Sequence, residues 1–372
     1  MTEKIPLFKI YNDENDLRYV NDVISSGMNW ATGSKVIQFE ESIAEYIGTK
    51  YSITFNSGIS ALHAALIAHG IGSGDEIIVP SFTFISTANS PLFVNARPIF
   101  ADIEESTLGI DPEDCIEKIT NKTRAIIPVH YGGCPCKIRE LREIADDYNL
   151  ILIEDAAEAF GAKFQDQKIG TFGESAMMSF CQNKIIATGE GGAIVTDSKN
   201  IAEKLKLIRS HGRLETSDYF STCGSMDYIT LGYNFRMSNI TAALGLSQIN
   251  KVEELISMRG QNAKIYFQNL KDCLKCKICL PPKDYHHVYQ LFSILVPQRD
   301  DLMKFLINKG IMAKIYFPPV HMTTFYKKVL GYSCDLPMTT RISNEILSLP
   351  FYPGMIKKDI KYVSDSVKEF LE

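Results

Sequence analysis

A lysine between two apolar runs is the residue whose type and setting point most directly to covalent chemistry. Lys184 lies in SAMMSFCQNKIIATGEGGAIVT, residues 175–196, and glycines follow it at 189, 191 and 192. A lysine among small and apolar neighbours can have a lowered pKa, which lets its amine form a Schiff base. The alternative is a hairpin with a solvated lysine at its tip, and this stretch alone does not decide between the two.

A carboxylate follows another apolar run. Asp155 comes directly after LILIE, residues 150–154, which is typical of a strand buried on both faces. Such a residue could hold Mg²⁺ in a nucleotide hydrolase, but the chain has no G-x-x-x-x-G-K-[ST] loop, and no G-x-G-x-x-G follows its first predicted strand. The remaining functional interpretation is a carboxylate that pairs with a cationic ring nitrogen or with a positioned base. The alternative is a buried aspartate that caps the next turn.

A third candidate is the start of a predicted helix. Asn56-Ser57-Gly58-Ile59-Ser60 follows YSITF, residues 51–55, and precedes an apolar helical run. Backbone N–H groups and the positive end of the helix dipole can bind an anion there, although an ordinary N-cap is the alternative. Together with Asp155 and Lys184, this start would supply what pyridoxal phosphate requires: contacts for its phosphate, its ring nitrogen and its aldehyde.

Alternating elements would position these residues. Short β-like runs separated by helical stretches predict βαβ units and a mostly parallel sheet, whose ligands bind beyond the carboxyl ends of the strands. These runs are 51–55, 76–80, 98–103, 124–129 and 150–154. A long helix capped by Ser238 and running to about 269 then leads into a smaller α+β section with strand-like runs at 288–297 and 311–317. We expect a large α/β domain over 1–245, with an N-terminal helical segment, and a small C-terminal α+β domain over 246–372.

The composition excludes several classes of protein. The chain has 372 residues, of which 45% are hydrophobic and 22% charged, as in an ordinary globular protein of about two domains. Its net charge of −5 argues against nucleic-acid binding by bulk electrostatics. The apolar runs are shorter than the ~20 residues that span a membrane, and the N-terminus lacks a signal-peptide pattern. We therefore expect a cytoplasmic protein without nucleic-acid or membrane partners.

The nine cysteines are scattered and odd in number, as expected for reduced thiols of a cytoplasmic protein. Cys273, Cys276 and Cys279 form a C-x-x-C-x-x-C run that would suit a thiolate metal site or an iron–sulfur cluster. A fourth ligand at cluster spacing is missing from the sequence, so no metal is predicted.

Six stretches of the chain resemble the DegT/DnrJ/EryC1/StrS family of pyridoxal-phosphate-dependent nucleotide-sugar aminotransferases. They are NSGISALHAAL, GDEIIVPSFTFISTANS, PVHYGG, IEDAAEAFGA, SFCQNKIIATGEGGAIVT and GYNFRMSNITAALGL, in the family's order and spacing. The resemblance runs from about residue 5 to the C-terminal helix. It implies the aspartate-aminotransferase fold (fold type I), pyridoxal phosphate as cofactor, and a homodimer with a shared active site.

The resemblance also assigns roles to single residues. Lys184 would form the Schiff base and act as general acid and base, and Asp155 would pair with the ring nitrogen. Phe84 would stack on the ring, Glu158 would lie near its phenolic oxygen, and Asn234 would reach the phosphate of the partner subunit. The phosphate contacts of the same subunit would come from Ser57, Gly58, Ile59, Ser60 and Ser179.

The substrates are also implied by resemblance. Lys184 favours transamination, because dehydratases of the family have histidine there. Glu158 and NKIIATGEGG are similar to the perosamine-synthase branch, which moves the amino group of glutamate to C4 of GDP-4-keto-6-deoxymannose. A UDP- or dTDP-linked keto sugar, or a non-transaminating protein on the same fold, is the alternative. Substrate contacts are expected from Arg213, Tyr316 and His321, and His130 could also face the pocket.

Overall fold

The computed structural model describes residues 4–214 and 227–372. A seven-stranded sheet forms the centre of the larger part, with strand order β1-β9-β8-β5-β4-β2-β3. Its strands are β1 (Tyr51–Phe55), β2 (Glu76–Pro80), β3 (Arg97–Ala101), β4 (Thr123–Ile126), β5 (Ile151–Asp155), β8 (Ser175–Ser179) and β9 (Gly192–Thr196).

The sheet is mostly parallel, as predicted. β2 pairs in parallel with β3 and β4, and β5 pairs in parallel with β4 and β8. β9 is the exception, because it pairs antiparallel with both β1 and β8. β1 and β8 therefore run in the same direction, and their carboxyl ends lie at the same edge as those of β5 and β2.

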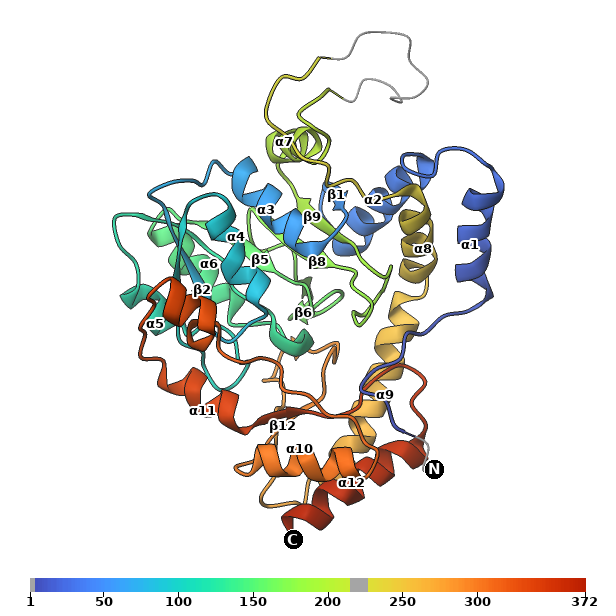
Figure 1. Cartoon of the computed structure of the whole chain (residues 1–372), viewed down its shortest axis with the longest axis vertical. Helices are drawn as coiled ribbons and strands as arrows, with labels where there is room; N and C mark the ends of the chain where they lie inside the picture. The colour runs from blue at the N-terminus through green and yellow to red at the C-terminus, as the bar shows by residue number, and fades with distance from the viewer. Residues whose placement is uncertain (1–3, 215–226) are drawn as a thin grey trace.

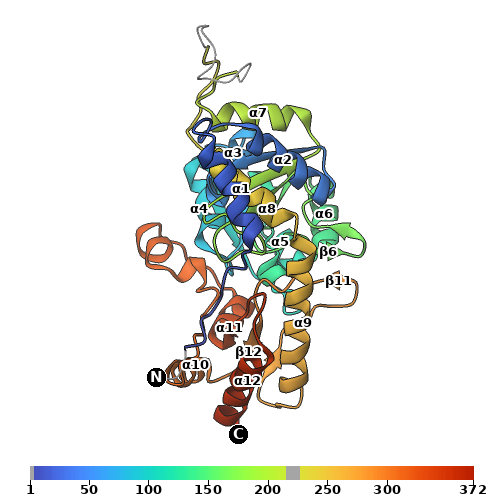
Figure 2. The same ribbon diagram turned by 90° about the vertical axis from the view of Figure 1, so that its right-hand side faces the viewer.

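Helices cover both faces of this sheet (Figures 1 and 2). One face buries apolar side chains of α2 (Ser34–Ile47), α5 (Pro112–Glu117), α6 (Ile138–Asp147) and α8 (Asn239–Ile249). The other face buries those of α3 (Gly58–Ala68), α4 (Ile85–Phe93) and α7 (Lys199–Arg209). Because both faces are covered, the strands are apolar almost throughout, which explains why LILIE shows no polar alternation.

The C-terminal part has a core of its own. It contains α9 (Val252–Leu270), α10 (Arg299–Asn308), α11 (Pro337–Glu345), α12 (Lys357–Leu371) and a sheet of order β10-β12-β13, formed by Lys277–Ile278, Ser293–Leu295 and Ile346–Ser348. Ile5, near the start of the chain, packs into this core and forms a bridge with Ile311. The first described residues and the C-terminal helix α12 thus both lie in the smaller part (Figure 1), and the domain boundary at 245/246 stays a prediction.

The predicted long helix over 238–269 is wrong in one respect, because it is two helices. α8 ends at Ile249 and α9 begins at Val252. Lys251, between them, has a φ of −114° and a ψ of 12°, outside the helical range. Its ammonium lies 2.9 Å from Asp16 Oδ2 and 2.7 Å from Asp13 Oδ2, at the start of α1 (Glu14–Ser25). The break therefore coincides with an ion-paired contact to a distant helix.

The predicted strand over 311–317 does not form, and a second small sheet joins the larger part to the C-terminal part. The run 311–317 forms only isolated bridges, between Ile5 and Ile311 and between Lys314 and Ser348. A second small sheet, β11-β6-β7, joins Tyr285–His286 to Lys163–Phe164 and Gln167–Lys168. It connects the C-terminal region to the loop that follows β5. No helix among the described residues is long and apolar enough to cross a membrane.

Candidate active site

The carboxyl ends of four strands bring the predicted site residues to one edge of the large sheet. Ser57 follows β1, Asp155 ends β5, Ser179 ends β8, and Phe84 comes four residues after β2. Phe55 and Ser179 both pair with Gly192 of β9, which places the start of α3 next to the end of β8. The chain reaches this edge from positions more than a hundred residues apart in sequence.

The start of α3 is closely packed and carries the free N–H groups of a helix N-terminus, which can bind an anion. Ser57 is the N-cap, and its Oγ accepts from Ser60 N at 3.2 Å. A Cβ on Gly58 would lie 3.1 Å from Met177 Sδ and 3.3 Å from Ser179 Cβ, so the Ser179 side chain lies directly against the first turn. Ser57, Gly58, Ile59, Ser60 and Ser179 thus lie together around N–H groups at the positive end of an eleven-residue helix, and their contact with a phosphate stays a prediction.

Asp155 is a buried carboxylate with two hydrogen-bond donors. Its Oδ1 accepts from Ala157 N at 3.1 Å, and its Oδ2 accepts from the Thr87 hydroxyl at 2.7 Å. Burial raises the pKa of Asp155 above its ordinary value, although the hydrogen bonds from the Thr87 hydroxyl and the Ala157 backbone, and then the positive charge of Lys184, act in the opposite direction. A carboxylate can accept about four hydrogen bonds, so both oxygens of Asp155 keep room for a further donor.

Lys184 forms an ion pair inside the site. Its Nζ lies 3.2 Å from Glu158 Oε1, and the two side chains are only 14% and 6% exposed. Glu158 Oε2 in turn accepts from Gly132 N at 2.8 Å. Glu158 is therefore fixed by the backbone on one side and presents its other oxygen to the lysine. The structure thus brings the two residues into direct contact, which the sequence did not predict.

Phe84 is a large apolar side chain left in the open. It is the residue before α4, and it is 57% exposed. Its ring centroid lies 5.8 Å from that of Phe317, which leaves much of the ring uncovered. An exposed aromatic ring on the same edge as Asp155 can stack on the flat ring of a bound molecule.

The predicted substrate residues lie in different settings. Tyr316 is buried, and its pKa is raised by burial and then by the negative charge of Glu158, which shows that it lies near the Lys184–Glu158 pair. His321 is also buried, with Nδ1 2.6 Å from the hydroxyl of Ser81 in the loop that leads to Phe84. Burial lowers the pKa of His321.

Arg213 and Asn234 lie on neighbouring segments. Arg213 is buried and forms a backbone bridge with Tyr228. Asn234 is exposed, and its carbonyl oxygen lies 3.5 Å from the side-chain amide nitrogen of Asn56, the residue before the N-cap of α3. The structure thus places Asn234 beside the start of α3 in its own chain. Its expected role in a partner subunit stays a prediction.

The expectation that His130 could face the pocket is wrong. Its side chain is fully buried, with Nε2 3.2 Å from Glu154 Oε2, and its Nδ1 accepts from Cys136 N at 3.1 Å. Both ring nitrogens are occupied within the fold, which gives His130 a structural role.

Three further contacts of the site were not predicted from the sequence. Gln290, in the C-terminal part, donates its amide to the carbonyl oxygen of Asn183, the residue before Lys184. Thr83 and Thr87 support Asp155 from the turn that carries Phe84. No sequence signal could indicate the Gln290 contact, because 107 residues separate its partners. The threonines lie in GDEIIVPSFTFISTANS, and their spacing of four around a helix start was a usable signal.

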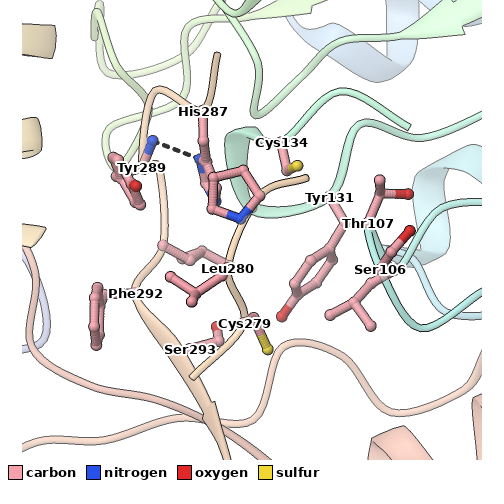
Figure 3. A pocket seen from close by; sticks show the side chains of 14 residues that line it. Ser106, Thr107, Tyr131, Cys134, Cys279, Leu280, His287, Tyr289, Phe292 and Ser293 are labelled. Carbon is pink, nitrogen blue, oxygen red and sulfur yellow. Dashed lines mark hydrogen bonds between the residues drawn. The ribbon is translucent and has the colours of Figure 1, made fainter. Parts of the chain in front are cut away.

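A pocket lies beside Gly132, the residue whose backbone N–H donates to Glu158 (Figure 3). Tyr131, Cys134 and His287 line it. Of the C-x-x-C-x-x-C run, Cys279 lines this pocket. Burial raises the pKa of both Cys276 and Cys279 to about 12, which disfavours thiolates. Among the described residues, no group of three His, Cys, Asp or Glu side chains is placed to hold a metal ion.

Comparison with known proteins gives a consistent result. The model of the DegT/DnrJ/EryC1/StrS aminotransferase family matches residues 11–368. An uncharacterized protein of Methanocaldococcus jannaschii is 37% identical, over 99% of this chain and 97% of its own. GDP-perosamine synthase of Vibrio cholerae is 34% identical, over 98% of this chain and 99% of its own. Among solved structures, Helicobacter pylori PseC, an aminotransferase involved in the biosynthesis of pseudoaminic acid, is similar with a TM-score of 0.93, 28% identity and 99% of each chain covered.

Proposed function

Because the chain belongs to the DegT/DnrJ/EryC1/StrS aminotransferase family, which makes it a pyridoxal-phosphate-dependent sugar aminotransferase, we propose that it moves the amino group of glutamate to C4 of a GDP-linked 4-keto-6-deoxy sugar. The observation that carries this proposal is the buried Lys184–Glu158 pair at the sheet edge that also holds Asp155. Glu158 is the residue by which the sequence is similar to the perosamine-synthase branch, and GDP-perosamine synthases are among the relatives.

The residues at the sheet edge fit pyridoxal phosphate. The crowded glycine at the start of α3, with Ser57, Ser60 and Ser179 around it, suits a phosphate group. Asp155 has free acceptor capacity for a ring N–H, and Phe84 offers an exposed ring for stacking. When bound, the cofactor supplies an aldehyde for amines and a ring that withdraws electrons from the reacting carbon.

We propose that Lys184 carries the proton in the reaction. Its amine would take the proton from the α-carbon of glutamate and deliver it to the cofactor carbon, and it would do the reverse with the sugar. Glu158, 3.2 Å away, would stabilise the ammonium form of Lys184 between these transfers. Asp155 would keep the ring nitrogen protonated, and its burial makes that pairing stronger than it would be in water.

We propose a homodimer with a shared site. Asn234 is exposed beside the residue that precedes the phosphate-binding turn. Several large apolar side chains of the chain are also exposed, including Trp30 at 50% and Leu231 at 79%. Apolar surface of this kind is typical of an interface between copies of a chain. A second copy would cover it and could bring its own Asn234 to the phosphate.

The visible spectrum of the purified protein tests the reaction. Added glutamate should remove the absorption band of the lysine-bound cofactor and produce that of the aminated cofactor, and GDP-4-keto-6-deoxymannose should restore the first band. Lys184→Ala is the control and should show neither change. Restoration only by UDP- or dTDP-linked keto sugars would replace the GDP assignment. A bound cofactor that glutamate leaves unchanged would overturn the glutamate donor.

A further inference from the structure

Two buried hydroxyl groups lie behind the carboxylate of Asp155. Thr87, in the first turn of α4, donates to Asp155 Oδ2 at 2.7 Å, and Thr83 Oγ1 lies 2.9 Å from Thr87 Oγ1. Thr83 is 2% exposed and Thr87 is 1% exposed. Water therefore does not compete for these bonds.

The direction of the chain of hydroxyls follows from the number of hydrogens. A threonine hydroxyl has one hydrogen to give and can accept two hydrogen bonds. Because Thr87 gives its hydrogen to Asp155, the hydrogen between the two threonines must come from Thr83. Each donor polarises the next in a low-dielectric site, so both bonds stabilise negative charge on Asp155 Oδ2.

This stabilisation opposes the effect of burial. Removal from water favours the neutral form of Asp155, whereas the hydrogen bonds from Thr87 and from the backbone of Ala157 favour the anion. Only the anion can hold a proton on a neighbouring ring nitrogen. The Ala157 contact comes from the main chain, and Lys184 acts by its charge without a hydrogen bond to Asp155, so Thr87 is the side chain whose hydrogen bond adjusts this balance.

The same turn also carries the ring expected to stack on the cofactor. The backbone N–H of Thr87 donates to the backbone carbonyl oxygen of Phe84 at 3.2 Å, so one main-chain hydrogen bond joins the residue that contacts Asp155 to the residue that carries the exposed ring. A shift of this turn would move both groups together.

We propose that Thr87 is a positioning residue, with Thr83 as its donor, that holds the carboxylate of Asp155 ionised and aimed at the cofactor ring nitrogen. The inference rests on the role proposed above for Asp155. It concerns no particular sugar or amino donor, so it can be tested separately from them.

The test compares Thr87→Val with Thr87→Ser, after loading each purified protein with pyridoxal phosphate labelled with ¹⁵N in its ring. Valine keeps the branched shape and removes the donor, whereas serine keeps the donor. Without Thr87 the carboxyl group binds a proton more tightly, so the ¹⁵N resonance of Thr87→Val should move toward that of an unprotonated ring. Its half-reaction with glutamate should slow by about 10- to 100-fold, the effect of one hydrogen bond to a charged group. Thr87→Ser should restore the unmodified resonance and a rate within about threefold of the unmodified rate.

Each outcome of this comparison either supports the proposal or overturns it. A Thr87→Val protein with the unmodified resonance would overturn the proposal, and so would a Thr87→Ser protein with the resonance of Thr87→Val. If Thr87→Val does not fold, Thr83→Val takes its place: the resonance should move in the same direction by a smaller amount, and an unchanged resonance overturns the chain of donors. The resonance is read without glutamate or sugar. Failure of the proposed function would appear instead as an unmodified protein that glutamate does not convert.

Discussion

Glu154 and Asp155 are neighbours on β5, and their carboxylates lie in two regions that differ in how many donors they offer. Glu154 accepts from the backbone of Gly170 at 2.9 Å, Phe172 at 2.8 Å and Gly173 at 2.9 Å. His130 adds a fourth contact at 3.2 Å. These donors use the full acceptor capacity of a carboxylate. Glu154 therefore fixes the loop before β8 and has no capacity left for a ligand.

The Asp155 region is the opposite case. Its carboxylate is equally removed from water but has two donors among the described residues, one on each oxygen. An incompletely satisfied buried carboxylate reduces stability, and a fold keeps such a group where a ligand completes it. The comparison shows that the number of open acceptor positions, more than burial, distinguishes a binding carboxylate from a structural one.

Removing the lysine is the most severe test of the Asp155 region. We expect Lys184→Ala to reduce transamination by about 10⁴-fold or more, because general acid–base catalysis and Schiff-base formation are both lost. The unfolding free energy of the cofactor-free protein should fall by about 3 kcal/mol, because Glu158, whose side chain is 6% exposed, keeps a buried charge without its partner. Rate assays and urea unfolding measure the two effects. Retained turnover would contradict the role of Lys184.

Exchanging each carboxylate for its amide should separate the two regions. Asp155→Asn should slow turnover by about 10²- to 10⁴-fold and should not lower the unfolding free energy of the cofactor-free protein. Glu154→Gln should do the reverse: the unfolding free energy should fall by about 3 kcal/mol, because a buried charge with four donors is disrupted. Turnover per folded molecule should change little. If both variants changed the unfolding free energy by similar amounts, the distinction between Glu154 as a structural carboxylate and Asp155 as a binding carboxylate would be wrong.

Mixing two inactive variants tests whether the Asp155 region needs a second chain. Lys184→Ala and Asn234→Ala proteins, unfolded and refolded together, should regain about a quarter of the unmodified activity, because half of the dimers are mixed and each has one intact site. Each variant refolded alone is the control. No recovery in the mixture would show that Asn234 acts within its own subunit or not at all.

The smallest effect concerns pH. The pKa of Asp155 is raised by burial in the folded, cofactor-free protein, so the folded state binds a proton more tightly than the unfolded state. Its unfolding free energy should therefore fall as pH rises from about 4 through the raised pKa, by about 1.4 kcal/mol for every pH unit that separates the unfolded-state pKa from the folded-state pKa. Asp155→Asn should lack this part of the pH dependence. Urea unfolding between pH 4 and 8 measures the difference, and identical profiles would contradict it.

Much of the site could be predicted because its signals are local. The apolar run before Asp155, the glycine and serines before α3 and the apolar flanks of Lys184 each lie within one short segment. Because ligands of parallel sheets bind beyond the carboxyl ends of the strands, these three segments are expected to lie at one edge of the sheet. The confirmed parallel arrangement of β2, β3, β4, β5 and β8 shows why that rule applied here.

The rest depends on contacts between distant segments. His130 follows a strand end, from which the sequence suggests that it faces the pocket. In the structure its side chain contacts Glu154 instead, 24 residues later. The helix break at Lys251 depends on Asp13 and Asp16, more than 200 residues earlier. The contact of Gln290 with Asn183 is of the same kind. Neither periodicity nor a motif indicates which distant side chain will fill a given hydrogen-bond position.

The antiparallel strand β9 has a consequence for the order in which the protein is assembled. Among the described strands β1 pairs only with β9, and their register joins Tyr51 to Thr196 and Phe55 to Gly192, about 140 residues apart. During synthesis β1 must wait unpaired until β9 has left the ribosome, as a free strand edge of the kind that promotes aggregation. The turn that we propose to bind the cofactor phosphate is attached to that strand. The nascent chain would therefore gain no stability from a cofactor bound there until about half of it has been made, and early folding depends on the parallel pairs among β2, β3, β4, β5 and β8.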